Sequence, residues 1–250
     1  MSIELESGIE ESYKEAYEFI LQVKDGLQKN NRFFVDECFL HKLNAIFEEA
    51  ETSIEKGTIL YRARKYNREE IDESRLGTQF EGYNAEESFV NLGSKWPTSG
   101  RMNAQGITVL YVANDIRTAI TELHPYFEEY YSVASIEVKN SLKIADLSKG
   151  WSTNDDDFTR FLAAYVQEWV SQGSSEKDYV FPQYISSYCK FLGYDGIGYR
   201  SKYATRENVR NNLGINYTIF NHSKCKAIES KLYQVRRVAV SISPYRSYME

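Results

Sequence analysis

Cysteine is scarce in this sequence, and its distribution excludes two common ways of stabilising a small protein. The three cysteines, Cys38, Cys189 and Cys225, are odd in number and far apart. Because they form no Cys-x-x-Cys pair, they indicate neither a disulfide framework nor a zinc knuckle. We expect each of them to be a small buried hydrophobic residue of a protein in a reducing compartment.

Long apolar runs and a basic excess are absent as well. The sequence has no stretch of about 18 apolar residues, so we expect no membrane span. Its acidic start, residues 1–6 (MSIELE), lacks the apolar core of a signal peptide. The formal net charge is −6 and Lys-Arg runs are missing, which argues against nuclear import and against a general nucleic-acid binder. We therefore predict a cytoplasmic protein that does not bind membranes and is not a general nucleic-acid binder.

Several catalytic motifs are missing too. There is no Gly-x-x-x-x-Gly-Lys-Ser/Thr motif of a P-loop, no Gly-x-Gly-x-x-Gly after a strand, and no His-Glu-x-x-His. The histidines His41, His124 and His222 stand alone, so we expect no metal site built on histidine. Arg32 and His41 are spaced too widely for the Arg–His motif of HEPN-type ribonucleases.

What the sequence does contain is ordinary for a globular protein. Its 250 residues are 42% hydrophobic and 26% charged, which is enough to bury one substantial core without disulfides or a metal. The 20 tyrosines and 13 phenylalanines suit sheets and aromatic-lined clefts. One large domain, or one domain with a helical extension, is the natural expectation.

Two amphipathic helices are predicted near the N-terminus. Residues 8–30 carry an apolar stripe at helical spacing, and residues 35–55 carry a second one. Gly57 follows, where a left-handed glycine can end a helix. We therefore predict an all-α extension at residues 1–56 and a second domain at residues 57–250. Two roles for the extension stay open, packing against that domain or binding a partner, including a second copy of the chain.

Strands and helices mix from residue 58 onward. β-Branched, aromatic or alternating residues predict strands at 58–64, 107–113, 131–138, 142–147, 195–200, 215–220 and 232–242. The third and fourth of these read as a neighbouring pair. Helices are predicted at 116–123 after a cap at Asn114 or Asp115, at 155–172, and at 179–192 before Gly193. Residues 65–106 read as a long polar connection, which is often functional. Without regular βαβ repetition, this order favours the α+β class over a doubly wound sheet.

Five segments resemble, in family order, the motifs of the RES family, which is named for its Arg, Glu and Ser. They run from about residue 58 to 222. Each segment alone is weak evidence for the family, but five of them in the same order are specific. They are residues 60–64 (LYRAR), 100–113 (GRMNAQGITVLYVA), 118–125 (TAITELHP), 193–201 (GYDGIGYRS) and 214–220 (GINYTIF).

This resemblance implies an ADP-ribosyltransferase-like mixed sheet core (the RES fold) behind the N-terminal helical extension. It also implies NAD+ as a substrate, no metal, and an antitoxin or immunity protein as a partner, because members of the family act as toxins that destroy NAD+. Three hypotheses stay open. The chain is an NAD+ glycohydrolase or phosphorylase, an ADP-ribosyltransferase acting on a protein or nucleic acid, or a non-catalytic RES domain that binds a partner.

The resemblance implies catalytic roles for Arg62, Tyr111, Glu122 and Ser201. Glu122 would lie beside the ribose and stabilise the positive charge that develops as the nicotinamide–ribose bond breaks. Arg62 would pair with phosphate oxygens, and Tyr111 would stack on the nicotinamide or donate its hydroxyl. Ser201 would donate a hydrogen bond to the dinucleotide; no histidine partner is evident that would make it a nucleophile.

Three further residues are candidates for binding NAD+: Arg64, Arg101 and Asn216. Arg64 rivals Arg62, since alternation places both on the same side of one strand. Arg101 and Asn216 either touch the ligand or order a loop, and Asn103 can tether the Arg101 loop through its amide. Ordinary structural roles also stay open for the four catalytic candidates: a surface glutamate, a strand salt bridge, a core tyrosine and a turn-capping serine.

The sequence departs from the family pattern in two places. Residues 103–106 (NAQG) lack the proline of the Asn-Pro-x-Gly loop, and the connection from Ser201 to Asn216 is longer and more charged than usual. Both departures bear on the acceptor of the ADP-ribose group.

Overall fold

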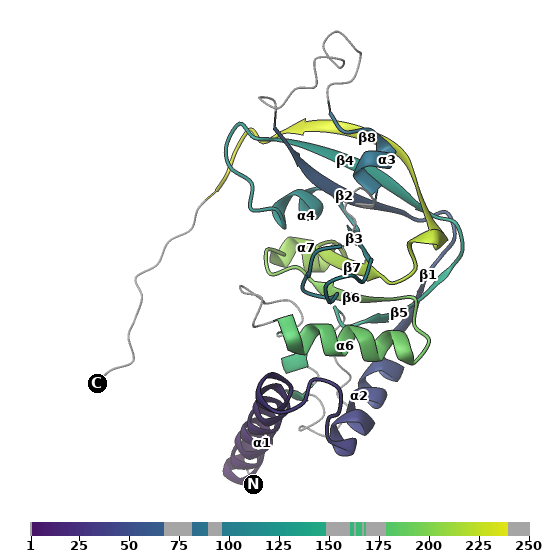
Figure 1. The fold of residues 1–250 in the computed structure, drawn as a ribbon. Coiled ribbons are helices and arrows are strands. Elements are labelled where there is room, and N and C mark those ends of the chain that lie inside the picture. The colour runs from purple at the N-terminus through teal and green to yellow at the C-terminus, as the bar shows by residue number, and fades with distance from the viewer. Residues whose placement is uncertain are drawn as a thin grey trace.

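The computed structural model combines helices at the N-terminal end with a large mixed sheet (Figure 1). It describes residues 2–67, 82–89, 97–148, 161–162, 164–166, 168 and 179–239. The predicted α+β class is therefore confirmed. No helix in these described ranges is long and apolar enough to cross a membrane.

Helices and strands alternate irregularly along the chain. The helices are α1 (Ser2–Lys29), α2 (Glu37–Glu49), α3 (Ala85–Phe89), α4 (Ile116–Thr121), α6 (Val180–Phe191) and α7 (Arg206–Arg210), with a 3-10 turn η4 at His222–Lys224. The strands are β1 (Glu51–Ile54), β2 (Ile59–Tyr66), β3 (Leu110–Ala113), β4 (Tyr130–Val138), β5 (Leu142–Asp146), β6 (Gly196–Arg200), β7 (Ile215–Ile219) and β8 (Cys225–Gln234).

The eight strands form one sheet in the order β1-β5-β6-β7-β3-β2-β4-β8, in which β5 and β6 are parallel and the other neighbours antiparallel. The number of residue pairs between neighbouring strands varies widely across the sheet. β2 and β4 are in register over the whole of Ile59–Tyr66, whereas β2 and β3 meet at the single pair Tyr61–Ala113. This seam divides the sheet into a half made of β2, β4 and β8 and a half made of the other five strands.

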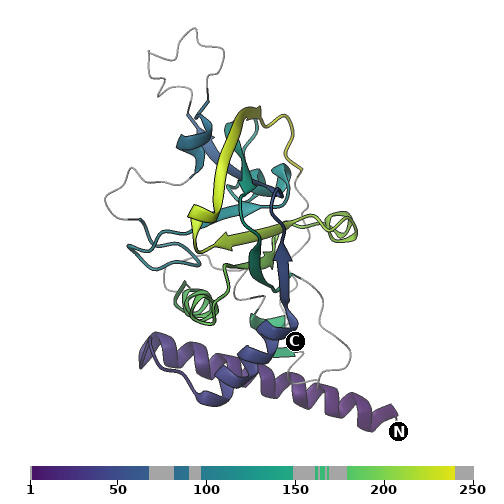
Figure 2. The same ribbon diagram turned by 90° about the vertical axis from the view of Figure 1, so that its right-hand side faces the viewer.

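Alternate residues of the five-strand half face two different hydrophobic clusters. Ile197 and Tyr199 of β6 pack with buried residues of α1, α2 and α6, which lie on one side of the strands (Figures 1 and 2). Ile215 and Ile219 of β7 belong to the other cluster, together with β4 residues such as Ile136. Since β4 and β7 are not neighbours in the sheet, the sheet curls around this second cluster.

The first predicted helix is confirmed, and the second ends earlier than expected. In α1 the expected stripe is buried at Ala16, Ile20, Val23 and Leu27. The helix predicted at 35–55 is wrong beyond Glu49, because Glu51–Ile54 forms β1 and pairs with β5. Gly57 has a left-handed φ of 87° in the turn between β1 and β2 and does not cap a helix. The division at residue 56 stays a prediction, but the segment before it is not wholly helical.

Two other expectations about strands are corrected. The strands at 131–138 and 142–147 exist as β4 and β5, but they are not a pair: β4 lies between β2 and β8, and β5 lies between β1 and β6. The last strand was predicted at 232–242, whereas β8 spans Cys225–Gln234. The part of β8 that pairs with β4 includes charged residues whose side chains are exposed, so the hydrophobic pattern of this strand is weak.

The remaining expectations concern single segments. The helix predicted at 155–172 lies mostly outside the described residues, although those described, such as Leu162 and Val166, are helical and buried. The polar connection at 65–106 contains α3, with residues 68–81 and 90–96 outside the described ranges. Cys189 and Cys225 are buried as predicted, but Cys38 is exposed in the first turn of α2.

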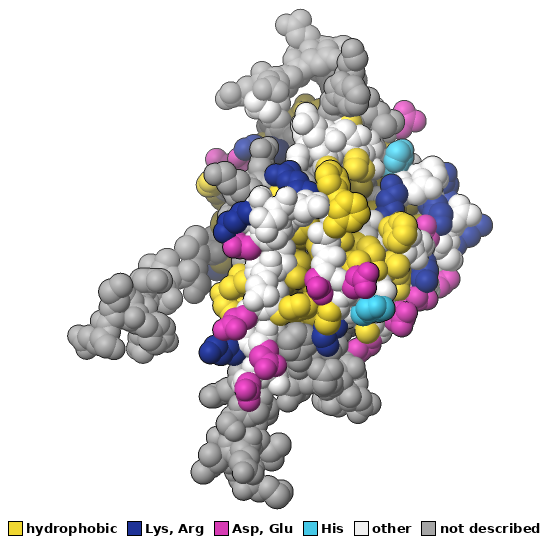
Figure 3. Space-filling model, turned by 60° about the horizontal axis from the view of Figure 1, so that its bottom comes forward, with side chains coloured by type: hydrophobic (Ala, Val, Ile, Leu, Met, Phe, Trp, Pro, Cys, Tyr) yellow, Lys and Arg dark blue, Asp and Glu magenta, His cyan; other side chains and the backbone are white. Residues whose placement is uncertain are grey.

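The helical side of the molecule carries exposed aromatic side chains. Phe33 and Phe34, between α1 and α2, are 79% and 80% exposed, and Phe191 at the end of α6 is 80% exposed. Figure 3 views the molecule from near this side and shows hydrophobic side chains gathered on the surface, with charged side chains around them. Exposed apolar area of this kind is often a contact surface.

Candidate active site

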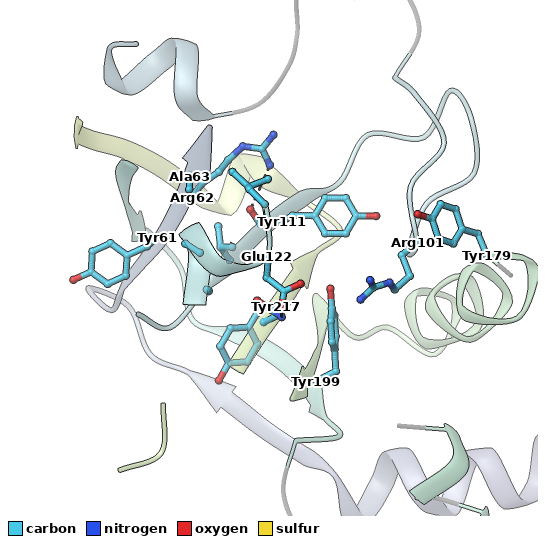
Figure 4. A pocket seen from close by; sticks show the side chains of 14 residues that line it. Tyr61, Arg62, Ala63, Arg101, Tyr111, Glu122, Tyr179, Tyr199 and Tyr217 are labelled. Atoms are coloured by element: carbon cyan, nitrogen blue, oxygen red, sulfur yellow. Dashed lines mark hydrogen bonds between the residues drawn. The ribbon is translucent and has the colours of Figure 1, made fainter. Parts of the chain in front are cut away.

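A cavity of about 310 Å³ lies at the seam of the sheet, where β2 and β3 share one residue pair. This volume is at the lower end of the range of about 300–1,000 Å³ that is typical of ligand pockets. Both sides of the seam and α4 contribute to its wall (Figure 4). Its polar and aromatic lining residues are Tyr61, Arg62, Arg101, Tyr111, Glu122, Tyr179, Tyr199, Asn216 and Tyr217.

Glu122 enters this cavity as the C-cap residue of α4. The helix begins where predicted: Asp115 is its N-cap and accepts hydrogen bonds from the Thr118 backbone N–H (2.8 Å) and hydroxyl (2.6 Å). The same carboxylate accepts from the Gly214 N–H at 3.0 Å, and the neighbouring Asn114 Oδ1 accepts from Ile215 N–H at 3.0 Å. These bonds tie the start of α4 to the start of β7, and so fix Glu122 relative to Asn216 on that strand.

The Glu122 carboxylate is held by two neutral donors. Its Oε1 accepts a hydrogen bond from the Ser201 hydroxyl at 2.6 Å and another from the Asn216 amide Nδ2 at 2.7 Å. Ser201 follows β6 directly and Asn216 lies on β7, its neighbour. Both donors therefore come from the rigid five-strand half of the sheet, and both bonds go to one carboxylate oxygen. Within the described part of the chain, this arrangement leaves Oε2 available to a ligand.

Ser201 is only 4% exposed, and its hydroxyl already has two partners. It donates to Glu122 and accepts from the Tyr203 N–H at 3.2 Å. In this structure the hydroxyl proton therefore points to Glu122. The predicted hydrogen bond from Ser201 to the dinucleotide stays a prediction, because it requires that proton to change partner.

Arg62 reaches across the seam from β2. Its Nη1 donates to the backbone carbonyl oxygen of Tyr111 on β3 at 3.3 Å. Its Nε is buried and has no hydrogen-bond partner in the described part of the chain. Burial lowers the pKa of the Arg62 guanidinium, and the nearby positive charge of Arg64 lowers it further. An anion bound beside Arg62 would relieve both effects.

Arg64 lies on the same strand as Arg62, but its environment is different. Its Nη1 donates to the Glu87 carbonyl oxygen, and its guanidinium lies 4.3 Å from the centre of the Tyr83 ring. It is not among the residues that line the cavity. The structure thus places Arg62, and not its rival Arg64, at the site.

Arg101 lies on a loop that three side chains fix in place. The Asn103 amide Nδ2 donates to the carbonyl oxygens of Thr98 (3.0 Å), Ala104 (3.2 Å) and Ile107 (2.9 Å). From α6, the Gln183 amide donates to the carbonyl oxygens of residues 100 and 103 at 2.8 and 3.0 Å. Asn103 is therefore placed as a tether of this loop, and the loop turns Arg101 toward the cavity (Figure 4). The Arg101 Nε is buried, again without a partner among the described residues.

Tyr111 is the third of these side chains, and it uses its hydroxyl within the protein. The hydroxyl donates to Asn103 Oδ1 at 2.7 Å and accepts from the Met102 N–H at 2.9 Å. Burial, and to a lesser degree Tyr199, raises the pKa of Tyr111, so it stays protonated at neutral pH. Its ring lines the cavity and is free to stack on a planar group, whereas the hydroxyl is committed to the loop.

Four other aromatic residues of the wall were not candidates from the sequence: Tyr61, Tyr179, Tyr199 and Tyr217. Tyr199 lies in the 193–201 segment and is paired with Asn216 of β7, and burial raises its pKa. Tyr179 immediately precedes α6 and lies beside Arg101 in Figure 4. Alternation along β6 could have indicated Tyr199, because it stands two residues before Ser201 and faces the same side. No local pattern distinguishes Tyr179.

The arrangement suits an anionic ligand that carries a group able to become positive. A single cavity contains one oriented carboxylate and two guanidiniums whose buried Nε atoms have no hydrogen-bond partner among the described residues. Within the described ranges, no three His, Cys, Asp or Glu residues are grouped so that they could hold a metal ion.

Comparison with protein-family models agrees with the motifs. A search of curated proteins finds no match. Among solved structures, one that is similar is the M. tuberculosis MbcT-MbcA toxin-antitoxin complex: the similarity covers 78% of this chain and 92% of that chain, with 13% sequence identity and a TM-score of 0.40. The family model described as "RES domain" matches residues 74–241, a range that includes Arg101, Glu122 and Ser201 but begins after Arg62. The chain belongs to the RES domain family.

Proposed function

We propose that this protein breaks the nicotinamide–ribose bond of NAD+ and passes the ADP-ribose group to water or phosphate. The observation that carries the proposal is the meeting, in one cavity, of Glu122 with Arg62 and Arg101. Destruction of NAD+ harms the cell that makes the enzyme. The proposal therefore includes a role as a toxin or defence effector and a partner protein that silences it.

Arg62 and Arg101 serve the anionic part of the substrate. A guanidinium offers a planar set of N–H donors that fits the oxygens of a diphosphate. Their buried Nε atoms lack partners in the described part of the protein, and a buried polar group without a partner is costly. A diphosphate that accepts from both arginines removes this cost, so binding is favoured by more than charge attraction alone.

Glu122 serves the reacting sugar. When the bond between ribose C1′ and the pyridinium nitrogen breaks, its electron pair leaves with nitrogen and neutral nicotinamide departs. The ribose becomes positively charged until an oxygen of water or phosphate bonds to C1′; the water or phosphate proton is released to solvent. A carboxylate that is already oriented stabilises this charge without rearrangement, and the Ser201 and Asn216 bonds provide that orientation.

The test is NAD+ consumption by the purified chain and by Glu122→Gln. Gln has the same shape but no negative charge, so we expect kcat to fall at least about 100-fold, the scale of losing one transition-state stabiliser. Glu86→Gln, an exposed glutamate of α3, is the matched control and should keep full activity. An active Glu122→Gln protein would contradict the role of Glu122.

Product analysis decides the acceptor. Free ADP-ribose in phosphate-free buffer identifies a hydrolase, and a phosphorylated ADP-ribose that forms only when phosphate is added identifies a phosphorylase. Label from NAD+ that stays on protein or nucleic acid in a lysate would instead identify an ADP-ribosyltransferase. If wild-type protein neither consumes nor binds NAD+ at millimolar concentration, the proposal fails and a partner-binding role takes its place.

A further inference from the structure

The segment between β6 and β7, residues 201–214, runs alongside α4 and is bonded to it at both ends. At the start of α4, the Asn114 Nδ2 donates to the Asn212 carbonyl oxygen at 2.7 Å, close to the bond between Asp115 and Gly214. At the other end, Ser201 donates to Glu122. This segment is one of the two places where the sequence departs from the family pattern, and it contains α7.

A second contact at the far end lies just outside the cavity. The Tyr203 hydroxyl and His124 Nδ1 are 2.6 Å apart, and their rings meet edge to face with centroids 5.6 Å apart. His124 is exposed and Tyr203 is 36% exposed, and neither lines the cavity. The pair stands two residues after Glu122 on one side and two residues after Ser201 on the other.

His124 holds an unusual backbone conformation at this point. Its φ is 52°, in the left-handed region that glycine adopts readily and that is uncommon for other residues. α4 ends here, since the N–H groups of Leu123 and His124 bond to the carbonyls of residues 120 and 121 and Pro125 follows. A helix commonly ends with such a left-handed residue, usually glycine. In this chain the tyrosine contact helps to hold a histidine there.

From this geometry we infer that His124 and Tyr203 form a latch that positions Glu122 for the reaction proposed above, on which this inference rests. The latch fixes the end of α4 against the 201–214 segment, and so keeps the Glu122 carboxylate within reach of Ser201 and Asn216. Neither latch residue touches the substrate. Both are positioning residues, and their effect on the reaction passes through Glu122.

The variant Tyr203→Phe removes the hydroxyl and keeps the ring. We expect kcat for NAD+ consumption to fall about fivefold while KM changes less than about twofold, because one hydrogen bond is lost and the arginines are untouched. In a His124→Gly background, Tyr203→Phe should have no further effect on kcat, since the partner is already gone. Tyr126→Phe, a 72% exposed tyrosine on the loop after His124, is the matched control and should behave as wild type.

Hydrogen exchange of the intact protein gives a readout that does not depend on turnover. In Tyr203→Phe, the amides of residues 118–126 should exchange faster than in wild type, while those of β6 and β7 stay protected. Unchanged exchange in this region, or unchanged kcat in an enzyme that consumes NAD+, overturns the latch. A kcat loss accompanied by faster exchange throughout the sheet also overturns it, because that pattern describes general destabilisation. If the wild-type protein does not consume NAD+, the proposed function is contradicted. The hydrogen-exchange result still decides whether the latch exists.

Discussion

The two sides of the cavity differ in how far their polar groups are satisfied. On the acidic side, Glu122 already accepts hydrogen bonds from Ser201 and Asn216. On the basic side, Arg62 and Arg101 each bury an Nε without a partner among the described residues. A group whose partners are in place keeps one orientation whether or not ligand is bound. In the proposed function, the acidic side is therefore organised before the substrate binds, whereas the substrate completes the basic side.

Apart from Glu122→Gln, the largest loss of activity should come from removing an arginine of the basic side. Arg62→Ala removes charge-assisted hydrogen bonds to the substrate, worth about 1.5–3 kcal/mol. We therefore expect kcat/KM for NAD+ to fall about 100-fold, mostly through KM. Steady-state kinetics checks this, with Arg64→Ala as the control from the same strand, because Arg64 is held by Glu87 and Tyr83 away from the cavity. Equal losses in both variants would remove the distinction between the two arginines.

A smaller loss of activity should come from removing one of the two hydrogen bonds that orient Glu122. Asn216→Leu keeps the side-chain size and the backbone pairing of β7 but removes one of two donors to Glu122. We expect kcat to fall about tenfold with little change in KM, at the scale of one hydrogen bond to a charged group. A change confined to KM would show that Asn216 contacts substrate and does not orient Glu122.

The smallest effect should come from disturbing the loop that carries Arg101. A Cβ atom at Gly100 would lie 2.5 Å from Asn103 Oδ1 and 2.7 Å from the Tyr111 hydroxyl oxygen, so Gly100→Ala must separate this bonded pair. We expect the free energy of unfolding to fall by about 1 kcal/mol, the lower end for overpacking, and KM for NAD+ to rise a few-fold. Thermal or urea unfolding and kinetics together test this.

Gly26→Ala should change the free energy of unfolding in the opposite direction and serves as the comparison for Gly100→Ala. Nothing lies within 4 Å of a Cβ at Gly26, and alanine favours a helix over glycine by about 0.8–1.0 kcal/mol. This variant should therefore be more stable than wild type and equally active. If both substitutions lowered stability alike, the crowding at Gly100 would not be the cause.

Much of the fold could be predicted from local sequence patterns, and the predictions that were wrong have a common cause. Apolar spacing located α1, α4 and α6 and most strands, because burial on one side repeats along a single element. Pairing partners carry no such signal: β4 and β5 are joined by three residues, yet they lie in different halves of the sheet. β1 was missed because Ala50 and Ile54 continue the spacing of α2, and four residues are too few to show alternation.

The candidate site shows the same limit. The motif resemblance selected Arg62, Glu122, Ser201 and Asn216, which the structure brings to one seam. Spacing alone could not have shown that Ser201 and Asn216 donate to the same oxygen of Glu122, since residue 122 lies far from both in the sequence. His124 looked like an isolated histidine for the same reason, because its partner Tyr203 is separated from it by 79 positions.

If NAD+ binds as proposed, the seam between β2 and β3 should couple occupancy of the cavity to the resistance of the protein to heat. One residue pair joins β2 to β3, and Arg62 of β2 also donates to the Tyr111 carbonyl oxygen on β3. A dinucleotide that touches both halves acts as an additional clamp. A ligand that binds only the folded form adds about 2.7 kcal/mol at 100 times its Kd. The shift in melting temperature with added nucleotide fragments would therefore report which portion of the molecule spans the junction.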